Sequence, residues 1–257
     1  MKNLVLRVLT ALFLLPPLVY LIWRGPLWML FGLSLLLGGH AFREWWEMCR
    51  FPRGLFFISC GAYFGAFFLA SKTLPGALWL LVALPSFYFL VYFRKEDFLR
   101  HFTQALSGLF YLFLGFWALF LIASKGRGDL LFLLAVVILE DTGAYFGGRL
   151  LGRNPFFPRI SPKKTREGFL LGLISGTLGG LAVNRWLGLY PWPLALFLGL
   201  ALSLLSPAGD LLESMVKRSC GVKDSGRILP GHGGLLDRVD ALLFVAPFFY
   251  AFLEVWG

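Results

Sequence analysis

Acidic residues are scarce in this sequence, which has 14 aspartates and glutamates against 24 lysines and arginines in 257 residues. Cysteine is scarcer still, and the three cysteines form no CxxC pair, which argues against a disulfide framework and a zinc site. The alternating polarity of transmembrane β-barrel strands is missing, as are internal repeats and low-complexity segments. The chain is instead 58% hydrophobic and 18% aromatic, and this composition argues against a soluble domain.

Apolar runs of about 20 residues recur along the whole sequence, and this is the length of helix that crosses a bilayer core. The sequence therefore predicts an all-α polytopic integral membrane protein with about nine transmembrane helices. We place these helices at roughly 4–22, 27–43, 55–70, 76–93, 105–123, 129–148, 168–186, 192–213 and 239–256. We expect one membrane-embedded unit, with N-terminal helices in residues 1–128 and the helices that carry the catalytic site in residues 129–257.

The net charge of +10 indicates topology and not a nucleic-acid partner, because cytoplasmic loops of membrane proteins are rich in lysine and arginine. With nine spans, one side of the membrane holds 19 of the 24 basic residues, and the other holds Arg24, Lys72, Lys125, Arg127 and Arg185. We therefore expect the N-terminus in the cytoplasm and the C-terminus outside, in a multi-pass protein of the cell inner membrane. The first apolar stretch lacks a small-residue cleavage site and is interrupted by two prolines, so we interpret it as a retained helix and not as a signal peptide.

Two carboxylates, Glu140 and Asp141, follow an unbroken apolar run near the inner end of a predicted membrane helix. Such residues are costly in a membrane and are usually kept for function, although a helix-packing motif with an incidental acid is the alternative. Glu44 and Glu47 flank two tryptophans at the expected cytoplasmic end of the second helix. We interpret these two glutamates as interfacial anchors.

A polar, glycine-rich stretch runs from Ser214 to Asp240 between two apolar segments. It combines the backbone N–H groups, cations and carboxylates that a phosphate and a metal ion require. One face of the predicted helix that leads into this stretch carries Asp210, Ser214 and Lys217. Glu213 precedes Lys217 by four residues, a spacing that allows an ion pair.

Asp237 and Asp240 open the last helix on one face. An acid at a helix N-terminus is also an ordinary dipole cap, and for Asp240 this alternative is open. Asp210 and Asp237 together, beside a basic loop, predict a hard-cation site. His232, which lies between glycines, is either a donor to a phosphate oxygen or a simple loop residue.

The segment from Arg149 to Arg166 carries six cations and no acid before Glu167. It is either a cytoplasmic loop that attracts anionic lipid headgroups or a binding segment for phosphates, with hydroxyl and ammonium groups from Ser161 to Thr165. The basic clusters, the carboxylates and the glycines together predict a cytoplasm-facing site for a polyphosphate and a divalent metal at headgroup level.

The stretch from Ser214 to Asp240 resembles the signature of the phosphatidate cytidylyltransferases, also called CDP-diacylglycerol synthases. The matching positions are Ser214, Lys217-Arg218, Lys223-Asp224, Gly226, Leu229-Pro230, His232-Gly-Gly234, Asp237-Arg238 and Asp240. Segments 141–149, 160–168 and 209–214 also resemble the family, so the likeness covers roughly 135–245. Two departures, Pro207-Ala208 and Ala241, remove no charged group.

The resemblance implies that CTP and phosphatidate give CDP-diacylglycerol and pyrophosphate at the bilayer surface, with Mg²⁺ and the option of K⁺ as a second ion. It implies that Asp210 and Asp237 hold the metal centre, while Asp141 and Asp240 support the metals or bind the nucleotide. It implies that substrate phosphates are bound by Lys217, Arg218, Lys223 and Arg238. The same signature contains Ser214, Asp224 and His232, which are implied to bind substrate as well. The residues implied for the lipid phosphate or the CTP tail are Lys163, Lys164 and Thr165.

Two other classes of function fit parts of this pattern. A CTP-dependent lipid-alcohol kinase, or an enzyme that joins a CDP-activated lipid to an alcohol, also uses carboxylates and a metal; a kinase would release CDP in place of pyrophosphate. A transporter or channel would place its acids near the midplane, whereas these acids cluster at the inner edge. The glycine-rich helix around 172–180 can pack within one subunit or between two, so a homodimer is open.

Overall fold

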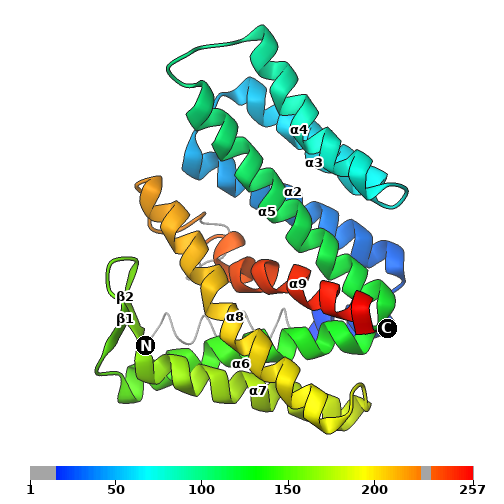
Figure 1. Ribbon diagram of the computed structural model, residues 1–257, viewed down its shortest axis with the longest axis vertical. Coiled ribbons are helices and arrows are strands. Elements are labelled where there is room, and N and C mark those ends of the chain that lie inside the picture. Colours follow the sequence, from blue (N-terminus) through cyan, green and yellow to red (C-terminus); the bar gives the residue numbers. More distant parts are fainter. Residues whose placement is uncertain (1–15, 227–232, 257) are drawn as a thin grey trace.

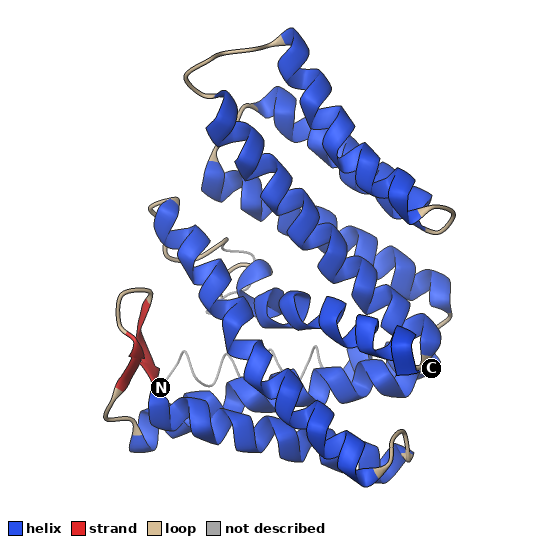
Figure 2. Cartoon of the chain, in the orientation of Figure 1, coloured by secondary structure: helices blue, strands red, loops and turns tan. Residues whose placement is uncertain are grey.

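The computed structural model describes residues 16–226 and 233–256 of the chain. Within these residues the protein is helical apart from one small hairpin (Figure 2). Residues 16–24 form a first helical stretch. The elements that follow are α2 (Leu27–Cys49), α3 (Arg53–Ala70), α4 (Leu74–Val91), α5 (Phe98–Lys125), α6 (Arg127–Leu151), β1 (Pro155–Phe157), β2 (Ser161–Thr165), α7 (Arg166–Leu187), α8 (Trp192–Ser219) and α9 (Leu236–Trp256).

Seven of the described helices, α3 to α9, are long and apolar enough to cross a membrane. They coincide with seven of the predicted spans, which confirms a helical, multi-pass membrane protein. The predicted span 27–43 lies in α2, which is not among the seven and continues into the polar segment that ends at Cys49. The span 4–22 falls mostly outside the described residues, so the count of nine stays a prediction.

The helices pack around two hydrophobic cores that α5 and α9 share (Figure 1). One core contains residues of α2, α3, α4 and α5, together with Leu236 and Leu243 of α9. The other joins Ile22, the end of α5, α6, α8 and the rest of α9. Figure 1 shows α3 and α4 at one end of the molecule and the α6–α7 pair at the other. The N-terminal end of α9 therefore lies against α2, which belongs to the first half of the sequence.

Helices α6 and α7 pack closely because glycines line their interface. A Cβ atom added at Gly176 would lie 2.4 Å from Ser203 Oγ and 2.8 Å from the backbone oxygen of Val136. One added at Gly172 would lie 2.7 Å from Glu140 Oε1. The glycine face of α7 thus packs within the subunit, and a homodimer has to use a different surface.

The segment between α6 and α7 is a two-stranded antiparallel hairpin, where the sequence predicted a basic loop. Phe156 stacks on Phe169 of α7, with ring centroids 4.8 Å apart. Thr165 Oγ1 accepts a hydrogen bond from the Gly168 backbone N–H (3.1 Å) and so caps α7. These contacts fix strand β2, and with it Lys163 and Lys164, beside the ends of α6 and α8.

Candidate active site

A cavity of about 390 Å³ lies between α6, α7, α8 and the hairpin. Its polar lining contains both negatively and positively charged side chains. Carboxylates come from the helices and cations come mostly from the hairpin, and the lining includes Glu140, Asp141, Arg149, Lys163, Lys164, Thr165 and Asp210. The sequence left open whether the basic segment binds phosphates or anionic lipid headgroups, and the fold brings it to one cavity with Glu140, Asp141 and Asp210.

Asp210 is the carboxylate that joins the hairpin to α8. Its Oδ2 lies 2.6 Å from Lys164 Nζ, and its Oδ1 accepts a hydrogen bond from Ser214 Oγ (3.3 Å) one turn further along α8. Both side chains of the ion pair are about one third exposed, at 27% for Lys164 and 32% for Asp210. An exposed pair of this kind is weak and exchangeable, so both charges are accessible to a ligand.

Asp240 is a second carboxylate at this end of the bundle and is only 7% exposed. The carboxylates of Asp210 and Asp141, which line the cavity, lie within electrostatic range of it. Neighbouring carboxylates of this kind favour a bound cation.

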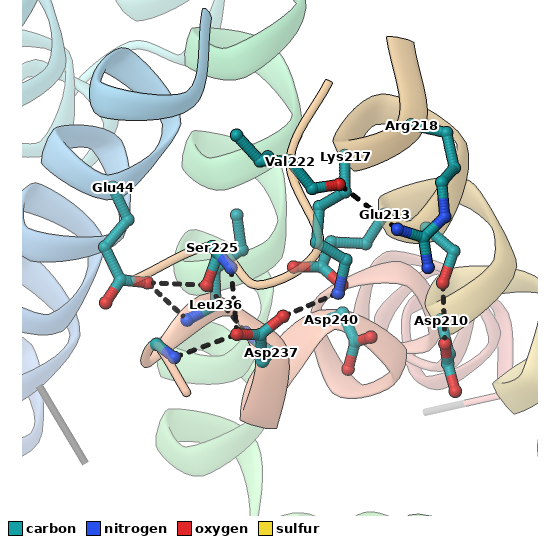
Figure 3. A network of polar contacts seen from close by, with 12 residues as sticks. Glu44, Asp210, Glu213, Lys217, Arg218, Val222, Ser225, Leu236, Asp237 and Asp240 are labelled. Carbon is teal, nitrogen blue, oxygen red and sulfur yellow. Dashed lines mark hydrogen bonds and ion pairs between the residues drawn. The ribbon is translucent and has the colours of Figure 1, made fainter. Parts of the chain in front are cut away.

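Lys217 lies in a separate, buried network, which Figure 3 shows. Its Nζ donates to Asp237 Oδ1 at 2.5 Å and forms an ion pair with Glu213, which is 1% exposed. The pairing of Glu213 with Lys217 predicted from their spacing is confirmed. Because Lys217 is itself 8% exposed, its ammonium lies between the two carboxylates largely away from water.

Asp237 also holds the chain on either side of residues 227–232. Its Oδ2 accepts hydrogen bonds from the backbone N–H groups of Ser225 (3.0 Å) and Gly234 (2.8 Å). Gly233 has a φ of +83°, and a Cβ atom there would lie 2.6 Å from Asp237 Oδ2, so this turn requires glycine. Both oxygens of Asp237 are thus engaged by protein donors.

Comparison with known proteins assigns a family to this arrangement. The model of the cytidylyltransferase family matches residues 5–256. The chain belongs to the cytidylyltransferase family. Similar relatives are the phosphatidate cytidylyltransferases of Helicobacter pylori strain ATCC 700392 / 26695 (44% identity over 160 residues) and of Staphylococcus saprophyticus (46% over 144 residues). These matches cover 61% and 55% of this chain, and 60% and 55% of the relatives' own lengths.

The residues predicted for the site of this cytidylyltransferase family member fall into two groups. The cavity holds Asp141, Lys163, Lys164, Thr165 and Asp210, with Ser214 bonded to Asp210. The second group lies around the α8–α9 connection and contains Lys217, Arg218, Lys223, Asp224, Asp237, Arg238 and Asp240.

The exposed members of the second group have different surroundings. Arg218 donates from Nη1 to the backbone oxygen of Val222 (3.2 Å). Lys223 and Asp224 are exposed on the segment after α8, and Arg238 is exposed within electrostatic range of Asp141. His232 lies outside the described residues.

The carboxylate of Asp237 already accepts hydrogen bonds from three protein donors, whereas that of Asp210 is partly exposed at the cavity. Within residues 16–226 and 233–256, no three His, Cys, Asp or Glu side chains are grouped so as to hold a metal by themselves. A magnesium ion usually needs only one or two carboxylates, because substrate phosphates and water complete its coordination. Asp210 can supply one such carboxylate, because its Oδ2 already accommodates the Lys164 ammonium and its side chain is partly exposed.

The interfacial role predicted for Glu44 is wrong. Glu44 is 3% exposed, and its carboxylate accepts hydrogen bonds from the backbone N–H groups of Leu235 and Leu236 and from Ser225 Oγ. Glu47, by contrast, is exposed and pairs with Arg43 at 2.9 Å, as an interfacial residue would. A helical period through the buried residues Ala41, Trp45 and Met48 places Glu44 on the buried face, and this was the available signal.

Proposed function

We propose that this protein is a phosphatidate cytidylyltransferase, which transfers CMP from CTP to phosphatidate and forms CDP-diacylglycerol and pyrophosphate in phospholipid biosynthesis. The family match over residues 5–256 is the observation that carries the proposal. The names of the similar relatives support it, as does a cavity in which carboxylates face lysines. CTP, phosphatidate and the lipid bilayer are accordingly the proposed partners.

In this reaction a phosphate oxygen of phosphatidate attacks the α-phosphorus of CTP, a new P–O bond forms, and the bond to the β-phosphate oxygen breaks to release pyrophosphate. The protein has to align the two phosphates and offset their charge. We propose that Lys163, Lys164 and Thr165 bind one of these phosphates at the cavity, because β2 fixes their position there. Lys223, Arg218 and Arg238 are proposed to bind the other, from the exposed side of the α8–α9 connection.

We propose that Mg²⁺ is held by Asp210 and Asp240, with Asp141 beside them, and that Asp237 holds Lys217 and the turn in place. When bound, the metal would neutralise phosphate charge and polarise the phosphorus under attack. The presence of Asp141 and Asp210 in the cavity lining, within electrostatic range of Asp240, supports this assignment. A comparison of assays in K⁺ and in Na⁺ salts tests whether a second, monovalent ion takes part.

We also propose nine transmembrane spans in the cell inner membrane, with the N-terminus and the active site facing the cytoplasm. The seven apolar helices and the uneven distribution of basic residues support this topology. After replacement of the three native cysteines, single cysteines introduced at Arg159, on the hairpin, and at Lys72, between α3 and α4, would test it in cells. The proposal requires a membrane-impermeant maleimide to label the Lys72 position from outside and to leave the Arg159 position unlabelled; the reverse pattern would overturn it.

The test of the activity uses purified protein with Mg²⁺, CTP and phosphatidate in mixed micelles. We expect CDP-diacylglycerol and pyrophosphate in equal amounts, with neither product formed when phosphatidate or Mg²⁺ is omitted. Release of CDP in place of pyrophosphate would indicate a kinase. Intact CTP in the presence of folded protein, Mg²⁺ and K⁺ would overturn the proposal.

A further inference from the structure

The first half of the sequence contributes one buried carboxylate to the site, that of Glu44 on α2. Its Oε1 accepts a hydrogen bond from the Leu235 backbone N–H (2.8 Å), and its Oε2 accepts from the Leu236 N–H (2.8 Å) and from Ser225 Oγ (3.1 Å). His40 Nε2 lies 3.3 Å from Oε1. Figure 3 shows the Glu44 side chain reaching from α2 toward the start of α9.

The chain around Glu44 is shaped to let its carboxylate approach the backbone. A Cβ atom at Gly226 would lie 2.5 Å from Glu44 Oε1, and one at Gly234 would lie 2.6 Å from Oε2. Both are closer than any real side chain allows, so both positions require glycine as long as Glu44 is in place. Glu44 therefore binds the chain before residue 227 and after residue 232 at the same time.

Ser225 connects Glu44 to the acid that holds Lys217. The Ser225 hydroxyl donates to Glu44 and accepts from the Asp237 backbone N–H (3.3 Å), while the Ser225 N–H donates to the Asp237 carboxylate (3.0 Å). Asp237 in turn accepts from Lys217 at 2.5 Å. A continuous path of hydrogen bonds thus runs from α2 through Ser225 to Asp237 and Lys217.

We propose that Glu44 is a positioning residue for the transfer reaction. It fixes the N-terminal turn of α9, and through Ser225 it fixes Asp237 and Lys217, without touching either substrate. This inference rests on the proposed function, since the reaction it serves is the cytidylyl transfer. Outer partners of this kind orient the residues that act directly, and their loss typically lowers activity by about 10- to 100-fold.

A carboxylate is required at this position, and glutamine cannot replace it. In Glu44→Gln the side-chain NH₂ takes the place of either Oε1 or Oε2. It then faces the N–H of Leu235 in one orientation and that of Leu236 in the other, so one donor always meets a donor. The glutamine has nearly the same volume, so the packing of α2 is retained while the hydrogen bonds are not.

The decisive comparison is between Glu44→Gln and Glu47→Gln, which removes an exposed carboxylate from the next turn of the same helix. Each variant would be purified in detergent and assayed for CDP-diacylglycerol formation. For Glu44→Gln we expect kcat to fall by about 10- to 100-fold with the KM for phosphatidate changed less than about 2-fold. Glu47→Gln is expected to keep both constants, because its carboxylate contacts nothing in the site.

A second readout does not depend on activity. Hydrogen exchange followed by mass spectrometry would report the amides of residues 233–240, and we expect them to exchange at least about tenfold faster in Glu44→Gln than in the wild type or Glu47→Gln. If Glu44→Gln does not fold, Ser225→Ala takes its place, because it removes the hydroxyl that joins Glu44 to the Asp237 backbone N–H and leaves the Glu44 bonds to Leu235 and Leu236. That variant is expected to lose about 3- to 10-fold in kcat.

Several outcomes would overturn this role of Glu44 or the function on which it rests. Wild-type kcat in folded Glu44→Gln, or unchanged exchange of residues 233–240, would overturn it. A fall in kcat accompanied by an equal rise in the KM for phosphatidate would also overturn it, because the cavity would then be affected too. If the wild type makes no CDP-diacylglycerol but residues 233–240 still exchange faster in Glu44→Gln, the proposed function fails. Glu44 then has only a structural role, which is to hold α2 against the start of α9.

Discussion

The two charged regions of this protein differ in how far their ion pairs are buried. At the cavity, Lys164 and Asp210 form a partly exposed ion pair, and Asp141 is a further carboxylate in the cavity lining. Around Lys217, by contrast, the lysine lies between the buried carboxylates of Glu213 and Asp237, and Asp237, Ser225 and Glu44 bind one another or the backbone. A partly exposed ion pair leaves charge accessible to ligands, whereas buried contacts fix geometry.

The difference in burial distinguishes two lysines to which the sequence motif assigns the same role. Lys217 and Lys223 belong to the same signature, and both were predicted to bind phosphate. In the structure Lys217 is 8% exposed between two carboxylates, whereas Lys223 is exposed on the segment after α8. Exposure leaves Lys223 accessible to a phosphate, the role that we propose for it, whereas Lys217 is engaged by Glu213 and Asp237.

The largest effect is expected from Asp210→Asn, which removes charge from the partly exposed ion pair at the cavity. We predict that pyrophosphate release at saturating CTP and phosphatidate falls by more than about 100-fold, beyond the effect of residues that only orient a metal ligand. Asp129→Asn is the control, because Asp129 pairs with Tyr190 at the opposite end of α6. Near-normal turnover by folded Asp210→Asn would contradict the metal assignment.

Lys217→Met tests the buried region around Lys217 through stability. The substitution leaves Glu213 and Asp237 buried without their cation, and we predict a loss of about 3–5 kcal/mol in the free energy of unfolding. Lys163→Met makes the same change at an exposed position of the cavity and is expected to alter stability by less than about 0.5 kcal/mol. Unfolding in mixed detergent micelles compares the two, and equal losses would abolish the distinction between the regions.

Gly176→Ala tests whether the close packing of α6 and α7 holds the cavity in shape. The new Cβ atom would meet Ser203 Oγ at 2.4 Å and the Val136 oxygen at 2.8 Å, so we predict a destabilisation of about 1–3 kcal/mol. Gly61→Ala on α3 is the matched control, because nothing lies within 4 Å of a Cβ atom there. The control is expected to keep or raise the unfolding midpoint. A similar loss of stability in both variants would show that the effect does not come from the close α6–α7 packing.

The sequence was sufficient for the local features of the site. The spacing of Glu213 and Lys217 predicted their ion pair, and apolar length predicted the spans that correspond to α3 to α9. Both depend on regular helix geometry, which is determined by neighbours along the chain. The signature residues likewise predicted the family that the comparison shows.

Contacts between distant segments could not be predicted in this way. Glu44 meets Leu236 from 192 residues away, and nothing local distinguishes it from Glu47 except a helical period. The hairpin was missed because its short strands are held by Phe156 on Phe169 and by the Thr165 cap, and not by alternating polarity. Its proline- and lysine-rich sequence is also unusual for strands.

The smallest effect is expected from Lys164→Met, and it sharpens the description of the cavity. The ion pair with Asp210 is partly exposed, so stability should change by less than about 1 kcal/mol. A phosphate that loses one charge-assisted hydrogen bond should bind about tenfold more weakly, and the KM of one substrate should rise accordingly with little change in kcat. Measuring KM for CTP and for phosphatidate separately identifies which phosphate lies beside the hairpin. If neither constant changes, Lys164 serves Asp210 alone, and the cavity binds its phosphate through Lys163 and Thr165.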